Sequence, residues 1–435
     1  MKIRNDGMIS ALLKDIPIPD MFRASQTFPR DRIPEDEIPA AIRKELSKEN
    51  IISRIRPGME IAITAGSRGI RNVALITRTI VDFVREQGAV PFIVPAMGSH
   101  GGATAEGQLE VLAGYGITPE TMGCEIRSSM ETVLLGVSAR GHNVYIDKNA
   151  YESDGIILSC RIKPHNAFRG KVESGMCKMM AVGLGKQQGA SLVHTDGMDV
   201  MAENVYTISQ VMVEKAPVLF GIPCIENAYD ETCYFEAVPA EEIHEREPEL
   251  LKYAFANMPS ILVKEADVLV VYEVGKNISG TGVDPNITGE FSTPYVTGGL
   301  KAQRRAHLNL TPESHGNALG SGLASAITKK IFDEIDVEAM YPNCITSTVI
   351  KSAMIPCVLY SDKEAIQFCI RTCNRIDQDH PRVVYIKNSL HIGEIMLSES
   401  YYEDVKAGKY PGVRALSAPA PLEFDPEGEL LTKIG

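Results

Sequence analysis

The sequence predicts an α/β protein with two α/β domains whose sheets are largely parallel. Two observations carry this prediction: a strand–helix–strand unit at residues 59–97, and a second series of strands and helices that begins near residue 266. The length of 435 residues and the hydrophobic fraction of 44% are sufficient for two buried cores. We place the first domain at residues 1–258 and the second at residues 259–399.

The strand–helix–strand unit positions the first candidate site residues. MEIAITAG (59–66) is typical of a buried strand, residues 73–88 of an amphipathic helix ending at Gly88, and AVPFIVPAM (89–97) of the next strand. The two strands lead into GSRG and GSHGG, which contain Arg68 and His100. Because open α/β sheets bind ligands at the carboxyl ends of their strands, Arg68 and His100 are expected at one ligand-binding edge.

The rest of the chain continues the alternation. A strand at 154–163 leads directly into His165, another strand is expected at 216–227, and the acidic stretch at 240–260 is interpreted as a helical connector. In the second domain we expect, in order, a strand at 266–275, a glycine-rich loop at 275–291, a small-residue helix near 319–334, a strand at 355–362, a helix at 363–376 and a strand at 382–388. The tail from 409 is rich in Pro and Gly and predicts a surface segment.

Composition excludes several classes of protein. The net charge of −12 and the lack of a long basic stripe argue against a nucleic-acid partner. No apolar run reaches the roughly 20 residues of a membrane span, and the start, MKIRNDGMIS, lacks the apolar core of a signal peptide. The cytoplasm is therefore the expected location. The nine scattered cysteines do not form a disulfide or zinc-ribbon pattern, and Cys369 and Cys373 are interpreted as core residues.

Four motifs carry residues with catalytic or ligand chemistry. They are GSHGG (98–102), KPHNAFRG (163–170), ESGMCKMM (173–180) and SLVHTDG (191–197), and they contain His100, His165, Lys178 and His194. Each residue alone could be structural, and Cys177 beside Lys178 is a further candidate for the site. Three histidines and a lysine in glycine-rich segments indicate a common site, because separate structural reasons would otherwise have to coincide.

Order and spacing of these residues resemble the nickel-dependent lactate racemase family over about residues 58–200. In that family a lysine carries the nickel pincer nucleotide, a pyridinium-3-thioamide-5-thiocarboxylic acid mononucleotide, and a histidine downstream binds the nickel. Lys178 and His194 match these two residues. The match is divergent: Ala65 stands in place of an acidic residue, and Gly-Met-Cys-Lys in place of Gly-Gly-Arg-Lys.

The resemblance implies roles for the remaining residues. His100 and His165 correspond to the acid and base on opposite faces of the substrate, and Arg68 to the arginine that grips its carboxylate. Ser67 is expected to contact the cofactor. The second domain is expected to close over an interdomain cleft and to supply a lysine, for which Lys276 is the candidate. The tail at about 400–435 is expected to pack back on the first domain.

The implied reaction is racemisation or epimerisation at C2 of a 2-hydroxy acid. The C2 proton beside a carboxylate is barely acidic, so removing hydrogen as hydride onto C4 of the cofactor's pyridinium avoids a carbanion. A base must take the hydroxyl proton at the same time, and histidine, with an ordinary pKa near 6.5, suits this at neutral pH. The cofactor's biosynthetic enzymes are the expected protein partners, and the oligomeric state stays open.

Two other functions remain open at this stage. His100, His165 and His194 could form a zinc site for hydrolysis, although this leaves Lys178 without a role and offers no glutamate base beside a ligand. The chain could also be a non-catalytic protein that binds a nucleotide or a sugar acid. Polar residues at 277–293 favour a polar substrate such as a sugar acid; they are Asn277, Ser279, Thr281, Asp284, Asn286 and Thr288.

Overall fold

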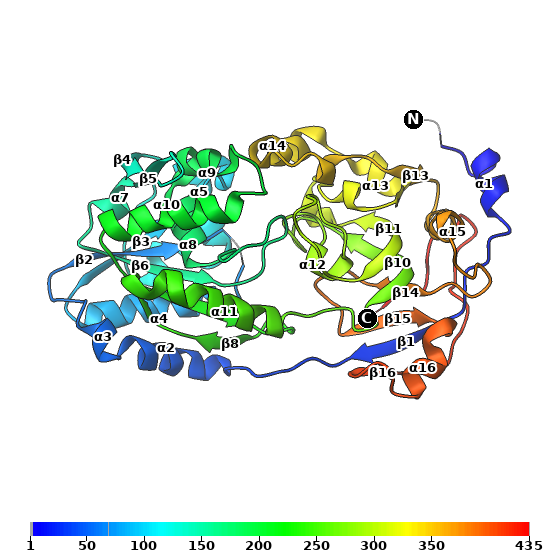
Figure 1. The fold of residues 1–435 in the computed structure, drawn as a ribbon, viewed down its shortest axis with the longest axis horizontal. Helices are drawn as coiled ribbons and strands as arrows, with labels where there is room; N and C mark the ends of the chain where they lie inside the picture. Colours follow the sequence, from blue (N-terminus) through cyan, green and yellow to red (C-terminus); the bar gives the residue numbers. More distant parts are fainter. Residues whose placement is uncertain (1–2, 68, 435) are drawn as a thin grey trace. The chain divides into compact units, whose positions relative to one another are not determined.

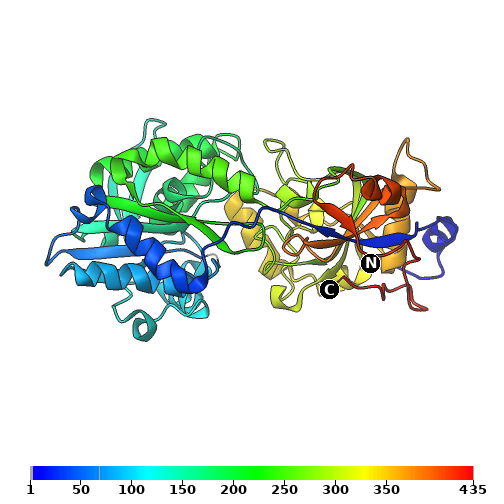
Figure 2. The same cartoon turned by 90° about the horizontal axis from the view of Figure 1, so that it is seen from below.

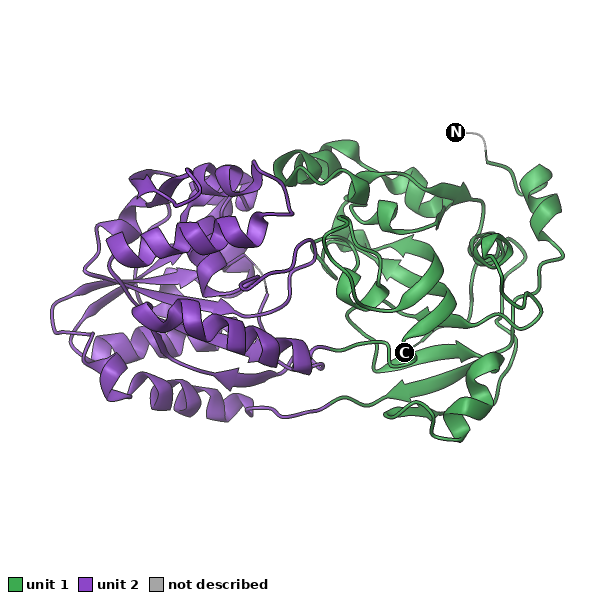
Figure 3. Cartoon of the chain, viewed as in Figure 1, with its two compact units in different colours: residues 1–28, 259–435 green, residues 29–258 purple. Residues whose placement is uncertain are grey.

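The computed structural model describes residues 3–67 and 69–434. The chain divides into two compact units (Figure 3). Unit 2 is one continuous segment, Pro29–Met258, whereas unit 1 combines Met1–Phe28 with Pro259–Gly435. Each unit is an α/β structure with its own sheet, and the sheets are largely parallel, as the sequence predicts.

The sheet of unit 2 contains the predicted strand–helix–strand unit. Its strands run in the order β3 (Val90–Pro95), β2 (Glu60–Ala65), β6 (Gly155–Arg161), β7 (Val218–Glu226) and β8 (Thr232–Phe235). The first four are parallel, whereas β8 and β9 (Val238–Pro239) pair with β7 in the antiparallel direction. The carboxyl ends of β2, β3 and β6 therefore lie at one edge of the sheet (Figure 1).

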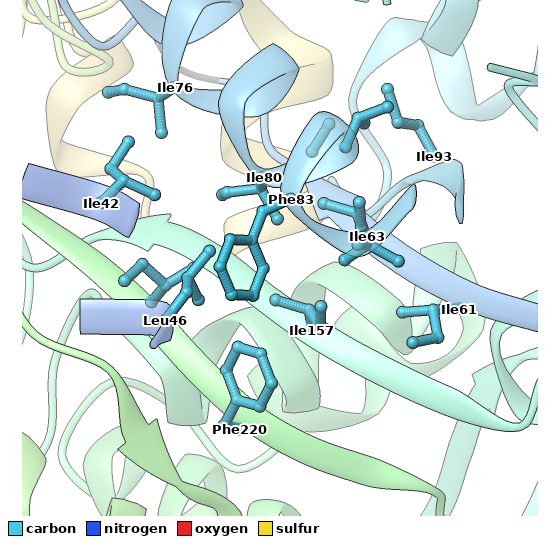
Figure 4. Close-up of a cluster of buried hydrophobic side chains, with 14 of the residues drawn as sticks. Ile42, Leu46, Ile61, Ile63, Ile76, Ile80, Phe83, Ile93, Ile157 and Phe220 are labelled. Carbon is cyan, nitrogen blue, oxygen red and sulfur yellow. The ribbon is translucent and has the colours of Figure 1, made fainter. Parts of the chain in front are cut away.

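Helices cover both faces of this sheet. On one face, α2 (Ile38–Leu46), α3 (Glu49–Ile52) and α4 (Val73–Glu86) bury an aliphatic core against the strands. Figure 4 shows Ile80 and Phe83 of α4 meeting Ile63, Ile157 and Phe220 of the sheet. Each such fully buried side chain contributes roughly 1.5–3 kcal/mol relative to exposure, so this cluster stabilises unit 2 substantially.

The opposite face carries the segments of the candidate site. Met176 of α8 (Met176–Lys178) lies over Gly221, on the side of β7 opposite Phe220, and the π-helix η3 (Met179–Leu184) continues from it. Around them lie α10 (Met201–Lys215) and α11 (Ile243–Asn257). The remaining elements of unit 2 are α5 (Ala105–Gly114), α6 (Pro119–Met122), α7 (Lys148–Tyr151), α9 (Lys186–His194) and the hairpin of β4 (Thr132–Val137) with β5 (Asn143–Asp147).

The interpretation of residues 240–260 as a connector is wrong. This stretch forms α11, which buries Leu250, Leu251 and Glu247 against β7 and α8. Apart from Glu247, the acidic residues of this stretch are exposed, so its charged face is easier to recognise in the sequence than its apolar face. The helix belongs to the body of unit 2.

Unit 1 is built on an eight-stranded sheet. The order is β13 (Cys357–Leu359), β12 (Ala326–Thr328), β11 (Lys301–Leu310), β10 (Glu265–Val274), β14 (Val383–Ile386), β15 (Glu394–Ser398), β1 (Met21–Gln26) and β16 (Val413–Ala415). The five strands from β13 to β14 are parallel, and the last three add in the antiparallel direction. The helices of unit 1 are α1 (Met8–Leu13), α12 (Pro285–Thr288), α13 (Lys329–Glu334), α14 (Val337–Ser347), α15 (Asp362–Thr372) and α16 (Tyr402–Lys406).

Both chain ends depart from the expected domain plan. β1 lies between β15 and β16, and Figure 2 shows this blue N-terminal strand beside the orange and red C-terminal strands. Leu430 and Ile434 enter the same core as Leu13 and Met21. The described part of the tail thus belongs to unit 1, where β1 offers it a sheet edge and an apolar core, whereas the sequence assigned it to the first domain.

The expected helix near 319–334 is also corrected. Residues 326–328 form the strand β12, and only Lys329–Glu334 is an α-helix. Ala326 pairs with Ala306 of β11, so the short apolar run at 326–328 forms a strand of the sheet and not a helix. Cys369 and Cys373 are both buried in the core of unit 1, as interpreted. None of the described helices is long and apolar enough to cross a bilayer.

Candidate functional site

Three predicted site residues follow the carboxyl ends of adjacent strands in unit 2. Ser67 comes after β2, His100 after β3 and His165 after β6. The Tyr115 hydroxyl donates to the backbone oxygen of Ser67 at 3.0 Å and fixes the first of these loops. Arg68 lies outside the described residues. The strand-end placement predicted from the sequence therefore holds for the described members of the set.

His165, Phe168 and Lys178 lie together. The His165 ring stacks on the Phe168 ring with 4.2 Å between centroids, and Lys178 Nζ lies 5.8 Å from the Phe168 centroid. Phe168 itself is buried, at 1% exposure, so it forms a rigid base for both side chains. An aromatic face next to an amine contributes a modest attraction. The KPHNAFRG motif thus supplies a histidine and the ring that orients it.

A buried carboxylate holds the His165 loop in place. Glu173 is 2% exposed, and its Oε2 accepts hydrogen bonds from the His165 backbone N–H at 2.7 Å and from Arg169 Nη1 at 3.2 Å. Burial raises the pKa of Glu173, and the bonds from His165 and Arg169 act in the opposite direction. The sequence analysis did not identify Glu173 or Phe168 as site residues, although both lie inside the motifs of Lys178 and His165. A single glutamate or phenylalanine in a motif carries no local signal of its burial or its partner.

Lys178 lies at the junction between α8 and the π-helix η3. π-Helical turns are rare and occur frequently at functional sites, since the extra residue per turn alters which side chains face one side. Gly221 allows the helix to approach the sheet, because a Cβ there would lie 2.3 Å from Met176 Sδ. The helix that contains Lys178 is thereby packed closely against the sheet.

His194 ends α9, and its ring has a defined orientation. Nδ1 lies 2.6 Å from the Ala190 carbonyl oxygen, which can only accept, so Nδ1 carries the hydrogen and Nε2 has the free lone pair. Burial lowers the pKa of His194, and the charge of Lys178 lowers it further. A neutral imidazole whose second nitrogen is held by a carbonyl is the usual arrangement of a metal-binding histidine.

The turn that bears His100 packs on the segment between Lys178 and His194. The Gly98 N–H donates to the Gly183 carbonyl at 3.2 Å, and Gly98 has a φ of +60°. A Cβ at Gly98 would lie 3.1 Å from the Val182 carbonyl oxygen and 3.3 Å from the Ala190 side chain. The glycines beside His100 thus permit a close approach, and the His100 side chain itself is exposed.

Positive charge concentrates around His165. Burial, and then the charges of Lys178, His194, Lys163 and Arg169, hold the pKa of His165 well below its ordinary value. His165 is consequently neutral at pH 7, which a proton acceptor requires. Clustered cations in a loop region at a sheet edge suit an anionic ligand such as a carboxylate or a phosphate.

Part of the chain matches a known protein family. Residues 6–198 match the family described as the lactate racemase N-terminal domain. The matched segment covers most of unit 2, and the chain is similar to lactate racemases over this part. Among solved structures, the lactate racemase apoprotein from Thermoanaerobacterium thermosaccharolyticum is similar, with 13% identity, a TM-score of 0.46, and coverage of 78% of this chain and 87% of that chain. No curated protein matches the sequence.

Two further candidates are Lys276, which lies outside the four motifs, and Cys177, which lies within ESGMCKMM (173–180). Lys276 belongs to unit 1, where its Nζ donates to the Gly280 carbonyl at 2.8 Å and to Asn343 Oδ1 at 2.6 Å. Cys177 is fully buried, and its thiol and backbone N–H face Glu247 of α11. Burial raises the pKa of Cys177 well above its ordinary value, so this thiol is a packing residue and not a ready thiolate ligand.

Proposed function

We propose that the protein is a racemase or epimerase that inverts C2 of a 2-hydroxy acid with a nickel pincer nucleotide bound at Lys178. One observation supports this above the others: Lys178 and His165 share the Phe168 ring, the charge of Lys178 lowers the pKa of both His165 and His194, and the His100 turn packs on the segment between Lys178 and His194. This chemistry needs a lysine for the cofactor, a histidine that can bind the nickel, and two histidines that act as acid and base. The match of residues 6–198 to the lactate racemase N-terminal domain supports the same proposal.

The side chains fit the proposed cofactor. Lys178 supplies the amine for covalent attachment, and His194 presents a neutral Nε2 as the one protein ligand that the nickel needs, since its other donors belong to the cofactor. Ser67, at the end of β2, is a candidate contact for the cofactor. When bound, the cofactor supplies a carbon that takes the C2 hydrogen as hydride and returns it to either face.

The chain's own residues handle the substrate and its proton. Arg68 offers a planar, permanently charged fork for the carboxylate, a role that rests on its sequence match alone. His100 and His165 take and return the hydroxyl proton on opposite sides of C2. His165 Nδ1 accepts the Ala167 N–H at 3.1 Å, so Nε2 is the nitrogen that faces a substrate. Lys276 stays a sequence-based candidate for substrate binding.

The zinc hydrolase is less consistent with the geometry. Within residues 3–67 and 69–434, no three His, Cys, Asp or Glu side chains are placed to hold a metal ion together. His100, His165 and His194 do not form such a group, and the exposed His100 lies on a separate turn. A non-catalytic binding protein would need no acid–base histidines, so His100 and His165 would then be dispensable.

The polar residues at 277–293 bear on which substituent the 2-hydroxy acid carries at C2. The polar loop that suggested a sugar acid uses much of its hydrogen bonding internally: Asn277 accepts from Thr311, Thr281 donates to the Val283 carbonyl, and Asp284 caps α12. These bonds account for several of the polar residues as loop structure. A panel that spans methyl, aromatic, acidic and polyhydroxy substituents on C2 is therefore the appropriate assay.

The decisive experiment is coexpression with the cofactor's biosynthetic enzymes in the presence of nickel. We expect the wild-type chain to gain the mass of the cofactor on the peptide containing Lys178, to bind nickel and to racemise at least one 2-hydroxy acid. Lys178→Arg keeps the positive charge but should gain no adduct. His194→Ala should keep the adduct and lose most of the nickel.

A matched control is Lys171→Arg, because Lys171 is an exposed lysine seven residues away whose Nζ lies 5.0 Å from the Tyr206 ring centroid. It should load and turn over like the wild type. Full racemase activity from unmodified, metal-free protein would contradict the proposed function.

A further inference from the structure

A buried ion pair lies behind the turn that carries His100. Lys186, the first residue of α9, and Asp147, the last of β5, are each 0% exposed, and Nζ lies 3.0 Å from Oδ2. Burial lowers the pKa of Lys186 and raises that of Asp147. Removing two charges from water costs several kcal/mol per ion, and aliphatic residues of similar volume are often as stable in such places. The pair therefore calls for an explanation other than packing.

The other contacts of Lys186 lead to the His100 turn. Its Nζ also donates to the Pro95 carbonyl at 2.6 Å, where β3 ends, and to Gln108 Oε1 at 3.1 Å. Gln108 is 0% exposed, and its Nε2 donates to the Gly98 carbonyl at 2.9 Å and the His100 carbonyl at 3.3 Å. A continuous chain of hydrogen bonds thus joins Lys186 to three backbone carbonyls on both sides of the turn.

The backbone conformation at Lys186 is unfavourable for a residue with a side chain. Lys186 has a φ of +53°, a left-handed conformation that disfavours side chains with a Cβ by about 1–2 kcal/mol. Glycine would adopt it without strain, and the sequence has glycine at the preceding position, Gly185. A lysine in this place, fully buried and strained, is consistent with a need for its ammonium group.

Lys186 also lies midway in sequence between Lys178 and His194. The ammonium group cannot reach a cofactor phosphate in this conformation, because it is fully enclosed by Pro95, Gln108 and Asp147. The GLGKQQG segment (183–189) resembles a nucleotide loop only superficially, and a phosphate contact by its lysine is disfavoured by this enclosure. What the ammonium group does reach is the backbone that orients His100.

We propose that Lys186 and Gln108 are positioning residues that fix the His100 turn relative to the segment bearing Lys178 and His194. This inference rests on the proposed function for its catalytic meaning, because the turn is held in order to place His100 against the substrate. A displacement of about 1 Å at a reacting group can lower turnover by roughly 100-fold, so such a support is worth its cost in stability. The alternative is that the cluster only stabilises the fold.

Gln108→Leu tests the proposal, because it removes the donors to Gly98 and His100 and leaves Lys186 paired with Asp147 and Pro95. We expect amide hydrogen exchange in the 97–104 peptide to accelerate about tenfold or more, whereas peptides of β6 and η3 exchange as in the wild type. Turnover should fall about 10- to 100-fold with KM within about twofold, and cofactor loading by intact mass should be unchanged.

Gln188→Leu is the matched control. Gln188 is an exposed glutamine on α9 whose Oε1 accepts from Thr132 at 2.8 Å, so its loss removes one hydrogen bond far from the turn. A second variant, Lys186→Met with Asp147→Asn, removes both buried charges at once and avoids an uncompensated carboxylate. It should reproduce the exchange effect.

The outcomes separate this inference from the proposed function. Unchanged exchange at 97–104 in Gln108→Leu overturns the positioning role, whether or not the protein is a racemase. Faster exchange with unchanged turnover also overturns it. If the wild type racemises no 2-hydroxy acid after cofactor loading, the proposed function fails, and local acceleration of exchange still establishes that Gln108 holds the turn.

Discussion

At the residue scale, His165 and His194, both partly buried, hold their hydrogens on opposite ring nitrogens. His194 Nδ1 faces a carbonyl oxygen and must donate, whereas His165 Nδ1 accepts the Ala167 N–H and leaves the hydrogen on Nε2. For His194 this frees Nε2 for a metal. For His165 to act as a base through Nε2, its hydrogen must move to Nδ1, so the bond from Ala167 must be released when the substrate binds.

We therefore predict that the free protein shows the Nδ1–H tautomer at His194 and the Nε2–H tautomer at His165. Because the pKa of each ring is lowered, both rings should stay neutral as the pH falls to about 6.5, where an ordinary histidine is half protonated. Nitrogen-15 NMR of histidine-labelled protein reports tautomer and charge directly. A protonated His165 at pH 7, or the same tautomer for both rings, would contradict this assignment.

At the element scale, the helix that carries Lys178 begins against a buried acid from α11. Glu247 is 0% exposed, its Oε2 accepts the Cys177 N–H at 2.8 Å, and its Oε1 makes no hydrogen bond within the described chain. Gly175 allows this approach, because a Cβ there would lie 2.6 Å from Glu247 Oε1. Burial raises the pKa of Glu247 to about 7.

Glu247→Gln should consequently stabilise the protein at alkaline pH. A folded pKa raised from 4.5 to about 7 means that the native state binds the extra proton, so stability is full below pH 4.5 and is lost as the pH rises through 7. The loss is about 3 kcal/mol above pH 8, at about 1.4 kcal/mol per pH unit, and a neutral glutamine escapes it.

Urea unfolding at pH 5, 6, 7 and 8 measures this effect. The difference between Glu247→Gln and the wild type should grow with pH. The control is Glu249→Gln on the same helix, where Glu249 is an exposed partner of Lys252 and little change is expected. Parallel stability curves for Glu247→Gln and the wild type would show that the buried carboxyl is not protonated near neutrality.

At the scale of the whole molecule, the two units depend on the chain ends differently. Unit 2 is continuous from Pro29 to Met258 and has its own core. Unit 1 requires residues before Phe28, because β1 separates β15 from β16 and is the partner of both. Leu13 and Met21 also complete the core that contains Leu430.

We expect a fragment of residues 29–258 to fold with a cooperative thermal transition. A fragment of residues 259–435 should not, because β16 loses its partner and the core loses its N-terminal side chains. Adding residues 1–28 to it as a separate peptide should restore structure. Circular dichroism with thermal melting tests all three, and independent folding of 259–435 would show that β1 is dispensable.

The sequence by itself determined the alternation of strands and helices, the strand-end placement of Ser67, His100 and His165, and the motif residues Lys178 and His194. These features are local, since periodicity and a strand's end are set by neighbouring residues. The tertiary structure alone decided what depends on distant partners. β11 is a polar segment that contains Arg305 and His307, yet it is a central strand because β10 and β12 flank it. The tail belongs to unit 1 because β16 pairs with the edge of β1. Lys186, Gln108 and Glu247 are important because they are buried, and a local pattern of charged and polar residues does not reveal burial.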